Sequence, residues 1–164
     1  MPEFVIHEMQ VGGGVLAISP LPGRTRHYYT DWLRLADWGP QVVVSMTEMH
    51  ELERKGAGTL GADLRNAGVV WRHLPVPDYG TPDAALDAAW PEVQAEVLDT
   101  LRQGGRVLVH CFGGCGRSGM VVLRLMIAAG VPDALRVLRR VRPCAVETED
   151  QMAWALQDQA ESKG

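Results

Sequence analysis

The sequence has few cysteines, little basic character at its start and no long apolar run, and each shortage excludes a class of protein. Three cysteines without regular spacing argue against a secreted disulfide scaffold. Residues 120–131 form the longest apolar stretch, but Arg124 interrupts it and a bilayer span takes about 20 residues. The first residues carry Glu3 and Glu8 and no basic, then apolar, run, so no signal peptide is predicted. We therefore expect a cytoplasmic location.

Lysine is also scarce, and the chain as a whole is acidic. Lys55 and Lys163 are its only lysines, and the formal net charge is −4. This composition predicts neither a nucleic-acid partner nor a membrane surface. A hydrophobic content of 46% and a charged content of 22% are typical of globular proteins, and 164 residues predict a single domain spanning 1–164. A monomer is favoured, although the sequence does not determine the oligomeric state.

Short apolar runs alternate with amphipathic segments along the chain. The runs predict strands at 4–6, 15–18, 42–44, 69–74 and 107–109. The amphipathic segments predict helices at 31–38, 48–55, 60–67, 83–103, 120–129, 133–141 and from 149 to about 161. Thr30 and Thr47 are the expected N-caps of the first two helices, and Pro91 predicts a kink or restart. The alternation predicts an α/β fold with a small, mainly parallel central sheet flanked by helices on both faces.

The most informative stretch is residues 106–119, where an apolar strand runs through a glycine-rich loop into a helix. Gly113, Gly114 and Gly116 allow the backbone to approach a ligand closely. Backbone N–H groups and the positive end of the helix dipole then surround one point, which suits a tetrahedral oxyanion. The predicted phosphate-binding residues are Phe112, Gly113, Gly114, Cys115, Gly116 and Arg117. In an α/β sheet this loop is expected at the carboxyl end of a central strand.

Cys111 and Arg117 bracket the loop and carry its predicted chemistry. The helix start, the loop N–H groups and Arg117 all favour a thiolate, which makes Cys111 the candidate nucleophile. Arg117 is expected to bind two phosphoryl oxygens with parallel hydrogen bonds, and Ser118 to donate a hydrogen bond to the sulfur. The alternatives are a buried inert cysteine, a surface salt bridge for the arginine and an N-cap role for the serine.

Further residues have supporting roles that the sequence leaves partly open. Asp78, in a proline-rich loop, is the preferred proton donor to the leaving oxygen, and Asp83 is its competitor. Asp83 follows Pro82 in a predicted first helical turn, where a carboxylate stabilises the helix. His110 is expected to be a buried imidazole that braces the loop through backbone hydrogen bonds, with direct catalysis as the alternative role. Gln151 either positions the attacking water or belongs only to a capping box.

Two other cysteines have alternative interpretations. Cys115 and Cys144 can act as redox partners of Cys111, forming a reversible disulfide with it, but the favoured interpretation is two small core residues. A zinc site is not expected, because the spacing lacks a paired C-x₂₋₄-C and H-x₃₋₅-H framework.

The residues from His110 to Ser118 match the His-Cys-x₅-Arg-Ser signature, and the chain resembles the cysteine phosphatase superfamily. Within it, the sequence is most similar to the dual-specificity subgroup related to kinase-associated phosphatase. The segments 21–23, 78–83 and 146–151 also resemble that subgroup, and 78–83 independently indicates Asp78 as the acid. The resemblance therefore extends over nearly the whole chain.

The resemblance implies hydrolysis of phosphate monoesters through a Cys111 phosphoenzyme, without metal or organic cofactor. No counterpart of the loop that deepens tyrosine-specific pockets is recognised, so phosphotyrosine and phosphoserine or phosphothreonine of proteins are all expected substrates. Loop residues 112–116 are uncharged, which disfavours an inositol phosphate. Three rival functions are a catalytically weak phosphoprotein-binding module, a thiol-dependent arsenate reductase and an RNA or polyphosphate triphosphatase.

Overall fold

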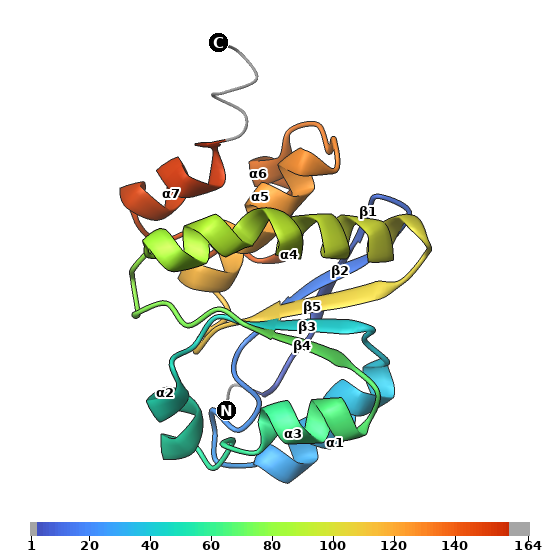
Figure 1. The fold of residues 1–164 in the computed structure, drawn as a ribbon, viewed down its shortest axis with the longest axis vertical. Helices are drawn as coiled ribbons and strands as arrows, with labels where there is room; N and C mark the ends of the chain where they lie inside the picture. Colours follow the sequence, from blue (N-terminus) through green and yellow to red (C-terminus); the bar gives the residue numbers. More distant parts are fainter. Residues whose placement is uncertain (1–2, 158–164) are drawn as a thin grey trace.

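A five-stranded sheet organises the chain, and it has the strand order β1-β2-β5-β3-β4 in the computed structural model, which describes residues 3–157 (Figure 1). The strands are β1 His7–Val11, β2 Gly14–Ser19, β3 Val42–Ser45, β4 Val70–His73 and β5 Arg106–His110. β1 pairs antiparallel with β2, and every other pairing is parallel. The predicted α/β class and mainly parallel sheet are confirmed.

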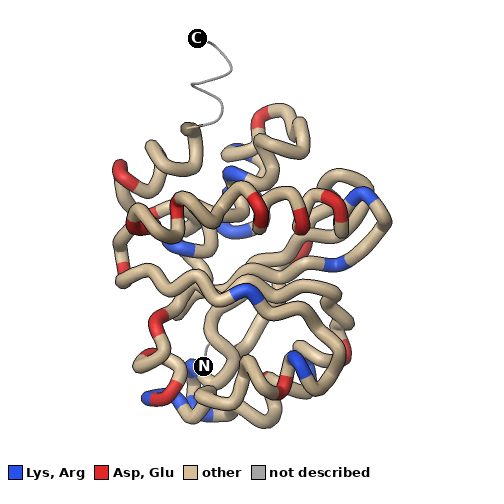
Figure 2. Tube along the Cα trace, viewed as in Figure 1, with Lys and Arg blue, Asp and Glu red and all other residues tan. Residues whose placement is uncertain are grey.

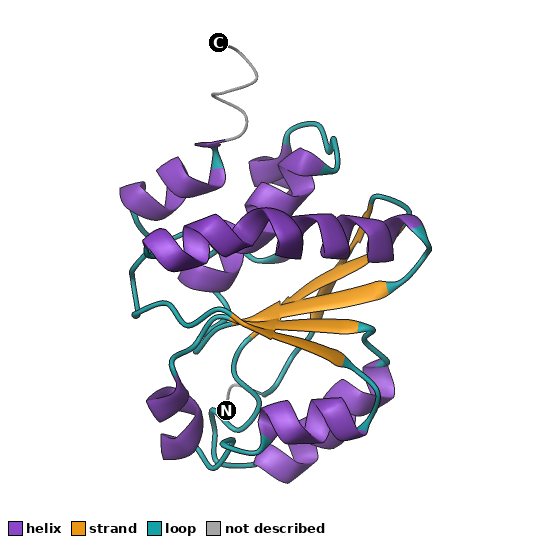
Figure 3. Ribbon diagram, viewed as in Figure 1, coloured by secondary structure: helices purple, strands orange, loops and turns teal. Residues whose placement is uncertain are grey.

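Helices cover both faces of this sheet (Figures 1 and 3). On one face lie α1 Tyr28–Trp38, α2 Met49–Arg54 and α3 Leu60–Asn66. On the other lie α4 Ala84–Arg102, α5 Gly116–Ala128, α6 Ala134–Val141 and α7 Glu149–Ala155. Alternate strand residues feed the two cores: Val107 and Val109 pack toward α4 and α5, and Leu108 packs toward α1 and α3.

The sheet register brings three strand ends together at one edge. His110, the last residue of β5, is paired with Ser19 of β2 and with Ser45 of β3. Because β5 lies between these two strands, the loop that follows it emerges at the centre of the carboxyl edge. Open α/β sheets bind ligands at such an edge.

The first strand differs from its predicted position. Strand β1 covers His7–Val11, not 4–6, because the turn at Gly12 and Gly13 directly follows Val11. Both glycines have positive φ, and they allow the tight reversal into β2. Phe4 is buried in the core on the α1 side without being in a strand.

Several helix ends also differ. Helix α1 begins at Tyr28 with His27 as its N-cap, not Thr30. Helix α2 is capped by Glu48, not Thr47, because Glu48 and Glu51 form a reciprocal capping box. Helix α7 ends at Ala155, short of the predicted residue 161, and positions 158–164 lie outside the described residues.

Helix α4 runs unbroken from Ala84 to Arg102, so the restart predicted at Pro91 is wrong. Pro91 is exposed, so water can hydrate the carbonyl that lacks a helical partner there. The predicted apolar face is confirmed, with Trp90, Val93 and Val97 buried, while acidic residues recur along the outer side of α4 (Figure 2).

Helix α5 begins at Gly116, inside the glycine-rich loop and before the predicted residue 120, and α6 begins at Ala134 rather than 133. No helix within 3–157 is long and apolar enough to cross a membrane.

Candidate active site

The loop from Cys111 to Gly116 joins β5 to α5, and its carbonyl oxygens all face away from its centre. Phe112 O accepts from Leu21 N at 3.0 Å, and Cys115 O accepts from Val146 N at 3.1 Å. Arg142 donates to two further carbonyls, to Gly113 O from Nη2 at 2.9 Å and to Gly114 O from Nε at 3.0 Å. The backbone N–H groups of 112–117 have no acceptor within residues 3–157. A concave set of free donors of this kind fits an oxyanion.

Two of the glycines leave space that no side chain can share. Gly114 has a φ of +72°, and a Cβ there would lie 2.7 Å from the backbone nitrogen of Pro20. A Cβ on Gly116 would overlap the carboxylate of Glu147 and the amide of Gln151. The glycines therefore allow neighbouring segments to pack directly against the loop.

Cys111 lies at the base of the loop, where the sequence places the nucleophile. Its side chain is buried, and its Sγ lies 3.1 Å from the hydroxyl oxygen of Ser118 in the first turn of α5. It is the one free cysteine among those described. The thiol thus faces a hydrogen-bond donor and the positive end of a helix dipole, both of which favour negative charge on sulfur.

His110 is fully buried directly beneath the loop. Its Nε2 lies 2.5 Å from Ser45 Oγ, and its Nδ1 lies 3.1 Å from Cys111 O. Cys111 O can only accept, so Nδ1–H donates to it, and in the neutral imidazole Nε2 then accepts from the Ser45 hydroxyl, which itself accepts from Trp71 Nε1. Burial lowers the pKa of His110 to about 4 despite the backbone hydrogen bond to Cys111. The predicted bracing contact with the backbone is present, together with a side-chain contact that the sequence did not indicate.

Arg117 is buried, so the alternative of a surface salt bridge is wrong. Its Nη1 and Nη2 each donate to Glu51 at 2.8 Å, and Nη1 also donates to Val76 O at 2.8 Å. Its Nε is buried and has no hydrogen-bond partner among residues 3–157. The parallel hydrogen bonds expected from Arg117 to an anion therefore have to come from Nε–H and the second Nη2 hydrogen, not from both terminal nitrogens. An unpaired buried donor beside free backbone N–H groups is a second feature that fits an oxyanion.

Glu51 is a site residue that the sequence did not reveal. Its carboxylate binds Arg117 with both oxygens, and Oε2 also accepts from Glu48 N at 2.8 Å. Burial pushes the pKa of Glu51 upward, but its hydrogen bonds to Arg117 and Glu48 N outweigh burial and hold it below its usual value of 4.5. The capping-box spacing indicates only a local role for Glu51. Nothing in the sequence signals a contact across 66 positions.

Asp78 and Asp83, the competing acid candidates, lie in different surroundings. Asp78 is exposed, and its Oδ1 lies 3.4 Å from Arg117 Nη2 and accepts from Tyr79 N at 3.0 Å. Asp83 is the N-cap of α4 and accepts from Leu86 N at 2.9 Å. The structure thus brings Asp78 to the loop and leaves Asp83 in the helix-stabilising role that the sequence suggests for it.

Gln151 is buried beside Gly116 and connects two segments of the site. Its Oε1 accepts from Glu147 N at 3.0 Å, and its Nε2 donates at 3.2 Å to the carbonyl oxygen of Gly80, two residues after Asp78. Thr148 accepts from Gln151 N, so the predicted capping box is also present. Capping alone therefore does not describe the position of this side chain.

A cavity of about 200 Å³ opens above the loop, between the segment that holds Asp78 and Tyr79 and the segment that follows α6. The ring of Phe112 lies at its rim, with the guanidinium carbon of Arg24 5.3 Å and the Lys55 Nζ 5.6 Å from the ring centroid. The cavity is lined by Arg24, Asp78, Tyr79, Phe112, Gly113, Cys115, Arg142 and Glu147. It therefore combines two carboxylates, two arginines and two aromatic rings next to the free N–H groups.

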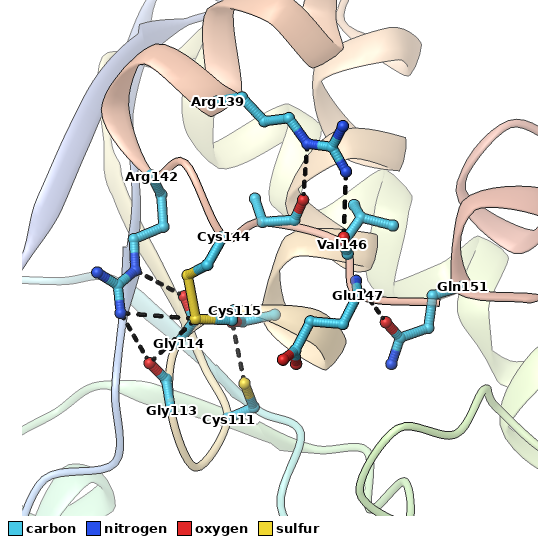
Figure 4. The surroundings of a disulfide bond; sticks show 12 residues. Cys111, Gly113, Gly114, Cys115, Arg139, Arg142, Cys144, Val146, Glu147 and Gln151 are labelled. Atoms are coloured by element: carbon cyan, nitrogen blue, oxygen red, sulfur yellow. Dashed lines mark hydrogen bonds between the residues drawn. A yellow bond between two sulfur atoms is a disulfide. The ribbon is translucent and has the colours of Figure 1, made fainter. Parts of the chain in front are cut away.

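Cys115 and Cys144 are bonded to each other, so the expectation of two separate core residues is wrong (Figure 4). The alternative of a disulfide with Cys111 is also not what the structure contains, because Cys111 is free. The two cysteines meet because the segment after α6 crosses the start of α5, where Val146 N donates to Cys115 O. Cys144 is exposed, and Cys115 lies on the inner side of the bond.

Taken together, the fold and this loop define the class of cysteine-dependent phosphatases. The sequence model of the family described as "Polymorphic toxin system, DSP-PTPase phosphatase" matches residues 19–131, and the chain belongs to this family of dual-specificity-type phosphatases.

Curated relatives and solved structures agree with this membership. Cyclin-dependent kinase inhibitor 3 of Mus musculus is 31% identical over 135 residues, which cover 77% of this chain and 63% of the relative. The Rattus norvegicus protein of the same name is 32% identical over 136 residues, with the same coverage. The matched part of this chain therefore spans less than two thirds of the length of these relatives.

Among solved structures, kinase-associated phosphatase with its catalytic-site cysteine replaced by serine superimposes with a TM-score of 0.82 at 23% identity, covering 100% of this chain and 98% of the other. This likeness concerns the fold. The active form of Tk-PTP has a TM-score of 0.70 at 30% identity and covers 94% of this chain and 97% of its own.

Proposed function

We propose that this chain hydrolyses phosphate monoesters, first of all phosphotyrosine and also phosphoserine and phosphothreonine of proteins, through a phosphocysteine on Cys111. One observation carries the proposal: the loop carbonyls are held outward, while its N–H groups and the buried Nε of Arg117 have no partner within 3–157. A dianionic phosphoryl group would satisfy these donors.

In the first step, the Cys111 thiolate attacks phosphorus and forms the S–P bond as the P–O bond to the leaving group breaks. Arg117 and the loop N–H groups bind the non-bridging oxygens and stabilise their charge in the transition state. Asp78, which lies 3.4 Å from Arg117 Nη2, donates its proton to the leaving oxygen. The products of this step are the dephosphorylated alcohol and the phosphoenzyme.

In the second step, Asp78 takes a proton from water, whose oxygen attacks phosphorus as the S–P bond breaks. The departing thiolate accepts a hydrogen bond from Ser118, which lies 3.1 Å from Sγ. Gln151 lies beside Gly116 and reaches the acid segment through Gly80 O, which suits a role in orienting that water. The residues form and cleave the phosphoenzyme without a metal or an organic cofactor in the proposed reaction.

The substrate class follows from the dimensions and charge of the cavity. A volume of about 200 Å³ with exposed Asp78 and Tyr79 at its rim accommodates a phosphorylated side chain presented on a protein surface. The loop side chains between Cys111 and Arg117 are uncharged, unlike what several phosphates on one ligand would require. A monomer in a reducing cytoplasm would keep the Cys111 thiol available for this chemistry.

The decisive test is rapid-quench hydrolysis of para-nitrophenyl phosphate with a chelator present, comparing wild type with Cys111→Ser. A burst of nitrophenol in wild type, acid-stable phosphate on the protein and no turnover in the variant would support the proposal. Wild-type rates in Cys111→Ser would overturn the nucleophile assignment.

The rival functions give different results in the same preparation. A phosphoprotein-binding module would bind a phosphotyrosine peptide without releasing phosphate from it. A thiol-dependent reductase would convert arsenate to arsenite with a dithiol present and leave the aryl phosphate unchanged. A triphosphatase would release phosphate from RNA 5′-triphosphate or polyphosphate in preference to the monoester.

A further inference from the structure

The segment that joins α6 to α7 forms one wall of the phosphate loop. Arg142 holds Gly113 O and Gly114 O, and Val146 N holds Cys115 O. Glu147 lines the cavity, and Gln151 lies beside Gly116. Figure 4 shows Arg142 on one side of the loop and Glu147 and Gln151 on the other. The outward direction of the loop carbonyls therefore depends on where this segment lies.

One covalent bond connects the segment to the loop. Cys115 is the N-cap of α5 and lies between two loop glycines, while Cys144 lies two residues after Arg142. Arg142 Nη2 is also 3.7 Å from Cys115 Sγ, so the disulfide and the arginine that orients the carbonyls are in contact. We infer that the Cys115–Cys144 disulfide is a positioning element for the phosphate loop, so that oxyanion affinity depends on the redox state of these two cysteines.

The chemistry of the switch is simple. Reduction breaks the S–S bond and adds two electrons and two protons, giving two thiols, while a dithiol reductant closes to its own disulfide. Cys144 is the exposed residue of the pair and Cys115 is half-buried, so we expect a reductant thiolate to attack from the side of Cys144. The two sulfurs, no longer bonded, then separate to van der Waals distance, and the wall segment can move relative to the start of α5. Cys111 takes no part in this exchange.

The direction of the effect follows from conformational entropy. With the disulfide formed, the loop is already in its anion-binding arrangement, as its outward carbonyls indicate. In the reduced protein, anion binding also has to order the released backbone. If this amounts to fixing the backbone of one further residue, the affinity for phosphate falls about tenfold. Thermodynamic linkage requires the reverse effect: bound phosphate makes the disulfide harder to reduce by the same factor.

The experiment uses the full chain with Cys111→Ser, which removes the nucleophile and its own oxidation. Thiols are counted by alkylation under denaturing conditions, with an expected count of zero before and two after treatment with dithiothreitol. The Kd of inorganic phosphate is then measured by calorimetry in both states. We expect weaker binding by about tenfold after reduction, and a shift of similar size in the disulfide's reduction equilibrium when phosphate is saturating.

A matched control is Cys111→Ser with Cys144→Ala, whose phosphate Kd should equal that of the reduced protein and should not respond to dithiothreitol. Cys144→Ser serves in the same way if the alanine variant folds poorly. Two thiols already present before reduction would overturn the inference, and so would equal or tighter phosphate binding after it.

The inference rests on the proposed oxyanion site, and the experiment separates the two. Equal phosphate binding in both redox states removes the positioning role and leaves the phosphatase proposal intact. Absence of phosphate binding in both states contradicts the oxyanion site itself, and the inference fails with it.

Discussion

Glu51→Gln is the substitution that most directly tests how the site is held. In the native protein the carboxylate binds Nη1 and Nη2 of Arg117, and Oε2 also accepts from Glu48 N. An amide has one oxygen, so whichever way it turns, an NH₂ group faces at least one N–H donor. Arg117 then remains buried while the residue at position 51 no longer carries the charge that balances it.

The expected cost is large because the arginine cannot reach water. Removing one partner of a buried ion pair costs about 3–5 kcal/mol of stability, and the remaining amide oxygen places Glu51→Gln near the lower end, about 3 kcal/mol. Displacement of Arg117 by a fraction of an ångström to one ångström should lower kcat/KM by about 100-fold. Urea unfolding at pH 7 and hydrolysis of para-nitrophenyl phosphate measure the two effects separately.

Glu53→Gln is the matched control, because Glu53 lies on the same helix, is exposed and makes no ion pair among the described residues. It should change stability by no more than about 0.5 kcal/mol. The pH dependence gives a further check. The pKa of Glu51 is lower in the folded than in the unfolded chain, so its stabilisation is complete above the usual value of 4.5 and lost as pH falls through the folded value. The gap between wild type and Glu51→Gln should narrow in acid. A variant with wild-type stability and kcat/KM would refute this account of Arg117.

Three other predictions concern separate parts of the site. Asp78→Asn should lower kcat by about 100-fold or more for a substrate with a poor leaving group, and by less for an activated aryl phosphate. The control Asp83→Asn still caps α4 and should leave kcat unchanged for both substrates. Equal losses of kcat on both substrates in Asp78→Asn would mean that another residue is the proton donor. Burial lowers the pKa of His110 from 6.5 to about 4, so between these pH values the unfolded chain binds a proton that the folded chain does not. The free energy of unfolding should therefore fall by up to about 3 kcal/mol as the pH is lowered from 6.5 to 4. Urea unfolding of His110→Asn over the same pH range should not show this fall. Arg24→Ala should raise KM for a phosphotyrosine peptide with acidic neighbours more than for para-nitrophenyl phosphate, because the Arg24 guanidinium lies over Phe112 at the cavity rim; an equal rise in both would assign Arg24 to the phosphate itself.

The sequence could predict the parts of this protein that local pattern determines. The apolar runs at 42–44 and 107–109 are buried strands, and the periodicity of Trp90, Val93 and Val97 marks the buried face of α4. The signature loop is also local, because its glycines, cysteine and arginine lie within a few positions of one another. Helix boundaries do not follow from local pattern alone, since a helix start depends on which side chain reaches the first N–H groups, as Glu48 does in place of Thr47.

The rest of the site depends on contacts that join distant segments. Glu51 pairs with Arg117 across 66 positions of the sequence, and Arg142 donates to loop carbonyls about 28 positions before it. No local pattern marks either contact. The disulfide belongs to the same group. Cys115 and Cys144 are 29 positions apart, and spacing alone cannot choose between a pair, two core residues and a partner for Cys111.

These distant contacts also explain why the proposed anion site of the signature loop depends on the fold around it. A peptide with the same residues would be free to turn any carbonyl inward, where it would repel an anion. Here Leu21 N, Arg142, Val146 N and the His110 imidazole each bind a carbonyl oxygen of the loop and hold it outward. The proposed anion site is therefore a tertiary feature, and residues outside the 112–117 segment determine which of its backbone groups face the anion. Substitutions at Arg142 should consequently weaken phosphate binding even though its side chain donates to carbonyls and leaves the N–H groups of the loop for the anion.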